Sequence, residues 1–290
     1  MVLSFEPLDA PLGATVVGFD PAASPGSETV AALRQGLVDH GVLVFRGTAI
    51  SPARLVELGR AFGELEILPE PEKRHPDHPE IFNLTNVRPD GDVVARDEPQ
   101  AVFLRGTERW HTDSSFRAVP SLCTMLYAVD VPEQGGETEF ADMYRAFDDL
   151  PAELGASTTG VRLIHSYAFS RANNPGALDP MSDEELARYP PVAHPLVRRH
   201  PDGRRSLYLG GHVAGVEGMD DRDGRRLIDE VLAHATQDRF VYRHRWKADD
   251  LVVWDNRSTL HRLRPYDIAG TRRVMRRITV AGTEAPTADS

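Results

Sequence analysis

The apolar positions of the chain follow two spacings, one helical and one strand-like. Helical spacing predicts helices over residues 29–40, 52–62, 142–150 and 221–236. Gly41 ends the first of these, and Ser51 followed by Pro52 is a favoured start for the second. The helices are few, and they are separated by longer stretches of a different pattern.

Short apolar runs bounded by glycine, proline or aspartate occupy those stretches and read as strands. We expect strands over residues 42–45, 81–87, 122–131, 161–169, 192–197, 206–209, 240–246, 251–254 and 274–280. Many short strands joined by turns, with a few helices, are typical of a mainly β fold. We therefore predict a sandwich or barrel core with helices packed on its outside, in a single domain over residues 1–282.

Two long polar segments, 88–108 and 170–191, show little periodicity and are predicted to be loops. Loops of that length in a compact domain often carry function, so both are candidate lids over a site. The tail over 283–290 is small, polar and interrupted by proline, which predicts disorder.

Composition narrows the possible functions. The 290 residues carry a net charge of -11, which disfavours binding to nucleic acids because their phosphates repel an acidic surface. A single cysteine excludes a disulfide within the chain. The N-terminus has no signal-like pattern, and no apolar run is long enough to cross a membrane. We expect a cytoplasmic protein with no membrane contact.

The first candidate for chemistry is Trp110-His111-Thr112-Asp113. In a strand, His111 and Asp113 would point to the same face and could share a metal ion. His261 lies far along the chain and could supply a second imidazole. Two histidines and one carboxylate make the facial triad of non-haem Fe(II) oxygenases, although the same set can also bind zinc.

A second candidate is the basic segment that contains Arg273 and Arg277. An even spacing puts both on one face of a strand, and a planar guanidinium suits the recognition of carboxylates. Each feature also has a purely structural interpretation. The HxD triplet could be a hydrogen-bonded strand, His261 a core histidine, and the arginine segment a charged sheet edge. Their order and their flanking residues favour the functional interpretation.

Those flanking residues extend over nearly the whole chain. They comprise Gly41-Val-Leu-Val-Phe-Arg-Gly47, Arg60-Ala-Phe-Gly-Glu-Leu65, Trp110-His-Thr-Asp-Ser-Ser-Phe116, Gly135-Gly-Glu-Thr-Glu-Phe-Ala-Asp-Met143, Phe240-Val-Tyr-Arg-His-Arg-Trp246 and Trp254-Asp-Asn-Arg257. With these motifs the chain resembles the taurine dioxygenase and 2,4-dichlorophenoxyacetate dioxygenase family. The resemblance implies a double-stranded β-helix (jelly-roll) core with flanking helices.

The resemblance also implies a cofactor set and roles for seven residues. Fe(II) would be held by His111, Asp113 and His261, with 2-oxoglutarate as cosubstrate and O2 as oxidant. The distal carboxylate of 2-oxoglutarate would meet Thr138 and Arg273. An anionic substrate would lie near Arg277 and His212, although His212 could instead be a strand-end histidine.

The substrate expected from the resemblance is a small organic anion. The histidine and tyrosine that help taurine dioxygenases bind sulfonate have no match in residues 66–71, and Thr107 replaces a family asparagine. The segment Gly210-Gly-His-Val213 and the stretch from His234 to Trp246 are more similar to the chlorophenoxyacetate branch. We therefore expect hydroxylation of an aryloxyalkanoate-like or related carboxylic acid, with release of succinate and CO2.

Several alternatives stay open at this point. The same iron chemistry could oxidise a sulfonate or an alkyl sulfate, or desaturate its substrate. Halogenation is disfavoured because the halogenases of this mechanism lack the carboxylate ligand that Asp113 provides. A zinc hydrolase has no use for Arg273 and Thr138, and a non-catalytic jelly-roll protein that binds small acids is a further alternative. A homo-oligomer, dimer or tetramer, is possible.

Overall fold

The computed structural model describes residues 3–68, 70–174 and 181–288. Its α-helices there are α1 (Ser27–His40), α2 (Pro52–Phe62), α3 (Pro99–Arg105), α4 (Met143–Asp148), α5 (Ala152–Thr158), α6 (Tyr167–Ala172), α7 (Asp183–Arg188) and α8 (Asp221–Ala235). The longer strands are β5 (Cys123–Asp130), β6 (Thr138–Asp142), β13 (Leu251–Asp255), β14 (Thr259–Leu263) and β15 (Val274–Val280). The shorter ones are β1 (Ser4–Pro7), β2 (Ala14–Val17), β3 (Val42–Phe45), β4 (Phe82–Thr85), β7 (Arg162–His165), β8 (Val192–Pro195), β9 (Val197–Arg199), β10 (Arg205–Leu207), β11 (Val213–Val216), β12 (Val241–His244) and β16 (Thr287–Ala288).

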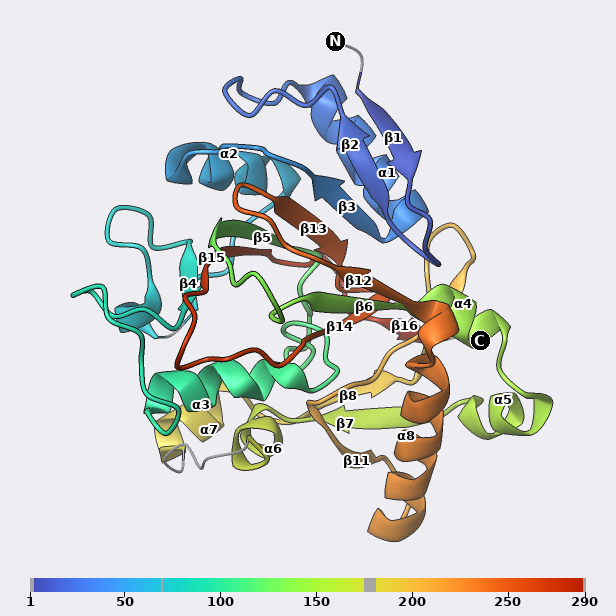
Figure 1. Cartoon of the computed structure of the whole chain (residues 1–290). Helices are drawn as coiled ribbons and strands as arrows, with labels where there is room; N and C mark the ends of the chain where they lie inside the picture. The colour runs from blue at the N-terminus through green and yellow to red at the C-terminus, as the bar shows by residue number, and fades with distance from the viewer. Residues whose placement is uncertain (1–2, 69, 175–180, 289–290) are drawn as a thin grey trace.

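Most strands belong to one large sheet and to two smaller sheets. The smaller sheets lie on the side of the large sheet away from α2 (Figure 1). The large sheet has the order β1-β2-β3-β13-β5-β15-β4 and is antiparallel except where β2 pairs with β3. The smaller sheets have the orders β12-β6-β14 and β11-β7-β8, and a fourth, β10-β9-β16, is also three-stranded. The predicted mainly β architecture with helices outside is confirmed.

The two faces of the large sheet bury different partners. On β5, Cys123 and Met125 belong to the core that α1 and α2 complete, whereas Leu126 and Ala128 face the opposite way. This alternation follows from the two-residue period of a strand. The second face meets the β12-β6-β14 sheet, where the rings of Phe140 and Trp254 lie 5.3 Å apart. The candidate chemistry lies between these two sheets.

The helix α8 is the most amphipathic element and covers the β11-β7-β8 sheet. Leu227, Ile228 and Val231 are buried against Val213 and Val216 of β11. Its N-cap, Asp220, accepts hydrogen bonds from two amides of the first turn, as expected for an aspartate in this position. In the part of the chain that the structure describes, no helix is long and apolar enough to cross a membrane.

The structure departs from the predicted elements in two places near the site. The segment 88–108, expected to be a loop, contains α3, which begins with Pro99 and ends before Gly106. The strand expected over 161–169 ends at His165, because the side chain of Ser166 accepts a hydrogen bond from the Phe169 amide and so caps α6. A cap is a local signal, and here it takes precedence over an apolar run.

The second long segment and the tail also differ from expectation. The candidate lid 170–191 contains the end of α6 and the whole of α7, while its residues 175–180 lie outside the described residues. The tail contributes β16, which pairs with β9 through Thr287 and Ala288. The N-terminal strands β1 and β2 have no counterpart in the prediction, and neither does β14, which carries His261.

Candidate active site

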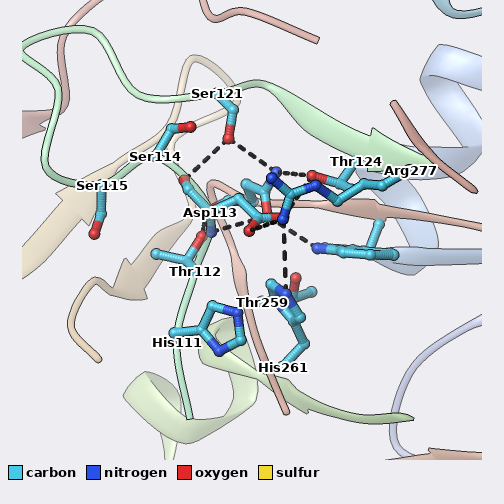
Figure 2. Close-up of polar contacts among 12 residues, drawn as sticks. His111, Thr112, Asp113, Ser114, Ser115, Ser121, Thr124, Thr259, His261 and Arg277 are labelled. Carbon is cyan, nitrogen blue, oxygen red and sulfur yellow. Dashed lines mark hydrogen bonds and ion pairs between the residues drawn. The ribbon is translucent and has the colours of Figure 1, made fainter. Parts of the chain in front are cut away.

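The structure brings together the three residues proposed as metal ligands. One donor atom from each of His111, Asp113 and His261 lies within 4.8 Å of the other two. His111 and His261 face each other across an isolated β-bridge, joined by main-chain hydrogen bonds of 3.0 and 2.8 Å. Asp113 follows His111 by two residues, and its Oδ2 lies 3.8 Å from His261 Nε2 (Figure 2).

The HxD triplet does not lie in a regular strand, which corrects the prediction. After the bridge at His111 the chain turns, and Ser114 has a φ of 55°, in the left-handed region. The Ser114 hydroxyl donates to Glu66 Oε2 at 2.8 Å, and that carboxylate lies 3.6 Å from Arg117 Nε. This contact stabilises an unusual backbone conformation directly beside Asp113.

The charges of the cluster suit a divalent cation. Burial lowers the pKa of both His111 and His261, so both imidazoles are neutral and carry a free lone pair. The Nδ1 of His111 lies 2.8 Å from the Arg109 carbonyl, which leaves Nε2 for a metal. Burial raises the pKa of Asp113, but the nearby Arg277 guanidinium and the hydrogen bond from the Thr124 hydroxyl outweigh it and hold the carboxyl ionised. Two neutral nitrogens and one carboxylate fit the ligand set of non-haem Fe(II).

His212 lies beside this cluster because the backbone before it is packed against the bridge. Gly210 has a φ of 132°, and a Cβ there would come within 3.0 Å of the His111 Cα, so only glycine fits. The His212 ring is 6.5 Å from that of His111, and its Nδ1 is 3.1 Å from Ser115 Oγ. Burial lowers its pKa to about 3, so His212 is a neutral group at the site.

Thr138 faces the same side of its sheet as His261. In the β6–β14 pair His261 is opposite Phe140, and Thr138 precedes Phe140 by two residues, so all three side chains share a face. The indole Nε1 of Trp246 donates to Thr138 Oγ1 at 3.0 Å. Because that oxygen accepts the indole proton, the hydroxyl proton of Thr138 is available for another acceptor.

Arg273 is a buried cation that lacks an anionic partner among the described residues. It is 4% exposed, its Nε has no hydrogen-bond partner there, and burial lowers its pKa to about 10. The turn before Thr138 packs against it, since a Cβ on Gly136 would lie 3.4 Å from Arg273 Nε. An unpaired buried charge is costly, so the position fits the carboxylate of a ligand.

A further residue, which was not predicted, holds Arg273 in place. Asn86, at the end of β4, accepts from the Arg273 amide at 2.7 Å and donates to the carbonyls of Ile268 and Thr271. Asn86 is fully buried and thus ties down the loop that leads into β15. Its partners are more than 180 residues away, so no local pattern could have identified this role.

One pocket is lined by two of the proposed metal ligands, His111 and Asp113, and by both substrate candidates, whereas His261, Thr138 and Arg273 do not line it. Arg277 lines it and lies 3.4 Å from Asp113, whereas its neighbour Arg276 does not line it. His212 lines the same pocket. Five aromatic side chains form much of the wall: Phe82, Phe103, Phe116, Tyr167 and Tyr189. Both segments considered as lids contribute to it, through Phe103 and Thr107 on one side and Arg171 and Tyr189 on the other.

Comparison with known proteins identifies the family. The model of the "Taurine catabolism dioxygenase TauD, TfdA family" matches residues 4–279. The chain belongs to this family. The α-ketoglutarate-dependent 2,4-dichlorophenoxyacetate dioxygenase of Cupriavidus pinatubonensis is 40% identical to it over 279 residues, which cover 95% of this chain and 96% of that protein. The (S)-phenoxypropionate/α-ketoglutarate dioxygenase of Sphingobium herbicidovorans is 31% identical and covers 96% and 95% of the two chains.

A solved structure agrees with this assignment. AAD-2, crystallised with Mn(II) and N-oxalylglycine, superposes with a TM-score of 0.89 and 35% identity over the full length of both chains. The TauD/TfdA protein described here is thus an Fe(II)- and 2-oxoglutarate-dependent dioxygenase with the jelly-roll core of its family. The alternative of a non-catalytic binding protein is not supported, because these relatives in the same family are named as dioxygenases.

Proposed function

We propose that this TauD/TfdA dioxygenase hydroxylates a small aromatic carboxylic acid of the aryloxyalkanoate type. The observation that carries the proposal is a single pocket that combines His111 and Asp113 with Arg277 and an aromatic wall. The relatives named for 2,4-dichlorophenoxyacetate and (S)-phenoxypropionate support this substrate class. The overall reaction consumes substrate, O2 and 2-oxoglutarate and yields hydroxylated substrate, succinate and CO2.

In this proposal His111, Asp113 and His261 hold Fe(II). The metal, when bound, supplies the activation of O2 that couples decarboxylation of 2-oxoglutarate to hydroxylation. The protein contributes two neutral imidazoles and one carboxylate, and the burial of Asp113 and His261 limits the access of water. Asp113 is the only anionic ligand of the three, and its pairing with Arg277 keeps it ionised.

Arg273 and Thr138 are proposed to hold the distal carboxylate of 2-oxoglutarate. The guanidinium of Arg273 offers charge without an anionic partner in the described part of the chain. Thr138 offers a hydroxyl proton, because Trp246 already occupies its oxygen as a donor. A charge-assisted pair with an added hydroxyl donor is a strong arrangement for a buried carboxylate.

Arg277 and His212 are proposed to meet the anionic group of the substrate. Among the described residues the pocket is lined by four arginines and two carboxylates, which favours an anion. The aromatic side of the substrate would lie against Phe116, whose ring is 4.7 Å from that of Tyr167 and 5.1 Å from His212. If the hydroxylated carbon bears an ether oxygen, the resulting hemiacetal collapses and the ether is cleaved.

The test of this function is substrate-dependent succinate formation in the presence of Fe(II), 2-oxoglutarate and O2. Phenoxyacetate should stimulate succinate release, and its neutral amide should not, because the two differ in the anionic group. Hexanoate, which is anionic without a ring, tests the aromatic wall. Taurine and an alkyl sulfate test the other substrates of the family. Stronger stimulation by alkyl sulfate than by any aromatic acid would overturn the proposed substrate class.

Replacement of Arg277 by glutamine is expected to raise the KM for the aromatic acid about 10- to 100-fold, since a buried charge pair is typically worth 2 kcal/mol or more. The KM for 2-oxoglutarate should change much less. Steady-state succinate assays with each substrate varied in turn separate the two effects.

Arg276→Gln is the matched control, because it makes the same change of charge one residue away on the other face of β15. We expect nearly unchanged kinetics for it. Equal losses in both variants would show that general electrostatics, rather than contact with the substrate, explains the effect.

The cytoplasmic location and the oligomeric state stay predictions.

A further inference from the structure

The carboxylate of Asp113 has a neutral hydrogen-bond donor that neither the motif nor the family match points to. The hydroxyl of Thr124, on β5, donates to Asp113 Oδ2 at 2.7 Å. Thr124 is fully buried. Figure 2 shows it on the side of Asp113 away from the two imidazoles. The contact therefore constrains the same carboxylate oxygen that lies 3.8 Å from His261 Nε2.

The direction of this hydrogen bond is set by Asn256. Its Oδ1 faces two groups that can only donate, the indole Nε1 of Trp254 at 2.9 Å and the amide of Asp113 at 3.4 Å. Its Nδ2 must therefore be the atom that faces the hydroxyls of Thr124 and Ser121, at 2.9 and 3.0 Å. Both hydroxyl oxygens accept from Nδ2 and must donate their own protons onward.

Both protons go to Asp113. Thr124 donates to the carboxylate, and Ser121 donates to the main-chain carbonyl at 3.0 Å. Asn256 is 1% exposed, and its own carbonyl accepts from the Thr112 hydroxyl at 2.7 Å. The HxD segment is thus held on one side by a hydrogen-bond network of Asn256, Thr124 and Ser121. The donor and the acceptor of each of these hydrogen bonds are determined.

We propose that Thr124, oriented by Asn256, is a positioning residue that selects one conformation of the Asp113 carboxylate for metal binding. The inference rests on the proposed metal-ligand role of Asp113. A carboxylate can rotate about its last bond, and the Thr124 hydroxyl holds Oδ2 while Arg277 lies 3.4 Å from Oδ1. Partners of this kind around a ligand commonly change metal affinity 10- to 100-fold when they are removed.

The large sheet provides a closely matched control. Thr124 lies between Trp254 of β13 and Thr279 of β15 in the strand register, so Thr124 and Thr279 point to the same face. Thr279 is 2% exposed, and its hydroxyl has no hydrogen-bond partner among the described residues. Valine at either position has nearly the shape of threonine and removes one buried hydroxyl. Only the change at Thr124 removes a contact with Asp113.

The experiment titrates the metal-free full chain with Mn(II) by calorimetry and records the visible spectrum with Co(II). Thr124→Val is expected to weaken Mn(II) binding about 10- to 100-fold and to alter the Co(II) bands. Thr124→Ser, which keeps the hydroxyl, should restore both, and Thr279→Val should match the wild type. If the valine variant does not fold, Thr124→Ala and Thr279→Ala replace the pair.

The wild type and Asp113→Ala separate this inference from the proposed function. Tight binding by the wild type, its loss in Asp113→Ala and unweakened binding in Thr124→Val would overturn the role of Thr124 alone. Equal weakening in the Thr124 and Thr279 variants would also overturn it, because packing would then be the cause. Equal Mn(II) binding by the wild type and Asp113→Ala would overturn the metal site and this inference together.

Discussion

The Asp113→Ala variant is expected to lose substrate-dependent succinate formation by about a thousandfold or more, because metal catalysis contributes several kcal/mol and each 1.4 kcal/mol is a factor of ten. Asp113 is the only anionic member of a buried cluster whose donor atoms lie within 4.8 Å of one another. Its removal leaves two neutral imidazoles that bind a divalent cation weakly. It also leaves Arg277 without its carboxylate partner. Succinate release and Mn(II) binding should both be measured.

Asp250→Asn is the control for the loss of a buried aspartate beside a histidine. Asp250 is 1% exposed and lies 3.4 Å from His244 Nε2, with Arg46 as a second partner. This cluster combines a carboxylate, an imidazole and a guanidinium, as the proposed metal site does. None of its three residues lines the pocket. We expect lower stability and normal Mn(II) binding. Wild-type turnover by Asp113→Ala would refute the proposed metal site.

The sequence was sufficient to predict that the three proposed metal ligands meet, but not the backbone that brings them together. His111, Asp113 and His261 were expected to converge, and they do. The strand proposed for the HxD triplet was wrong, because a serine with a φ of 55° follows Asp113 and its hydroxyl bonds to Glu66. Positive φ at a serine depends on a tertiary contact 48 residues away, which no local pattern reveals.

For the helix α3, in contrast, the residues that mark the start and the end of a helix were present in the sequence. Pro99 stands at the first helical position, Gly106 follows the last, and Ala101, Val102 and Leu104 form its buried side. The charged residues on either side obscured this short pattern within a longer polar segment. The four-residue strands β1 and β2 were missed for a different reason, since they include exposed positions and lack the fully buried apolar run of the equally short β3.

The hydrogen-bond network around Asp113 could not have been predicted from the sequence. Asn256 entered only as part of the Trp254-Asp-Asn-Arg257 motif, and Thr124 had no expected role. Asn256 contacts Thr124 and Ser121, which lie 132 and 135 residues earlier in the chain. The distinction matters because motifs identify ligands, whereas the residues that orient those ligands depend on the register of distant strands.

Replacement of Arg273 by methionine is expected to raise the KM for 2-oxoglutarate about 100-fold, since loss of one partner of a buried hydrogen-bonded charge pair typically costs 2–5 kcal/mol. The turnover number at saturating 2-oxoglutarate should fall less, because Arg273 would contact the distal carboxylate and not the reacting atoms. Arg272→Met is the control, since Arg272 is an exposed neighbour paired with Asp130. Its 2-oxoglutarate KM should equal that of the wild type.

Although Arg273→Met should weaken the binding of 2-oxoglutarate, it should increase the stability of the folded protein without 2-oxoglutarate. Burial lowers the pKa of Arg273 to about 10, and no carboxylate among the described residues compensates its charge. Methionine fills similar space without that desolvation cost, so without 2-oxoglutarate Arg273→Met should melt at a higher temperature than the wild type. With Mn(II) present, 2-oxoglutarate at 100 times its wild-type Kd should stabilise the wild type by about 2.7 kcal/mol, and the variant, whose Kd should be about 100-fold higher, by only about 0.4 kcal/mol. A variant that is less stable than the wild type without 2-oxoglutarate would show that Arg273 supports the fold itself, and equal stabilisation of both proteins by 2-oxoglutarate would show that its missing anion is not the cosubstrate.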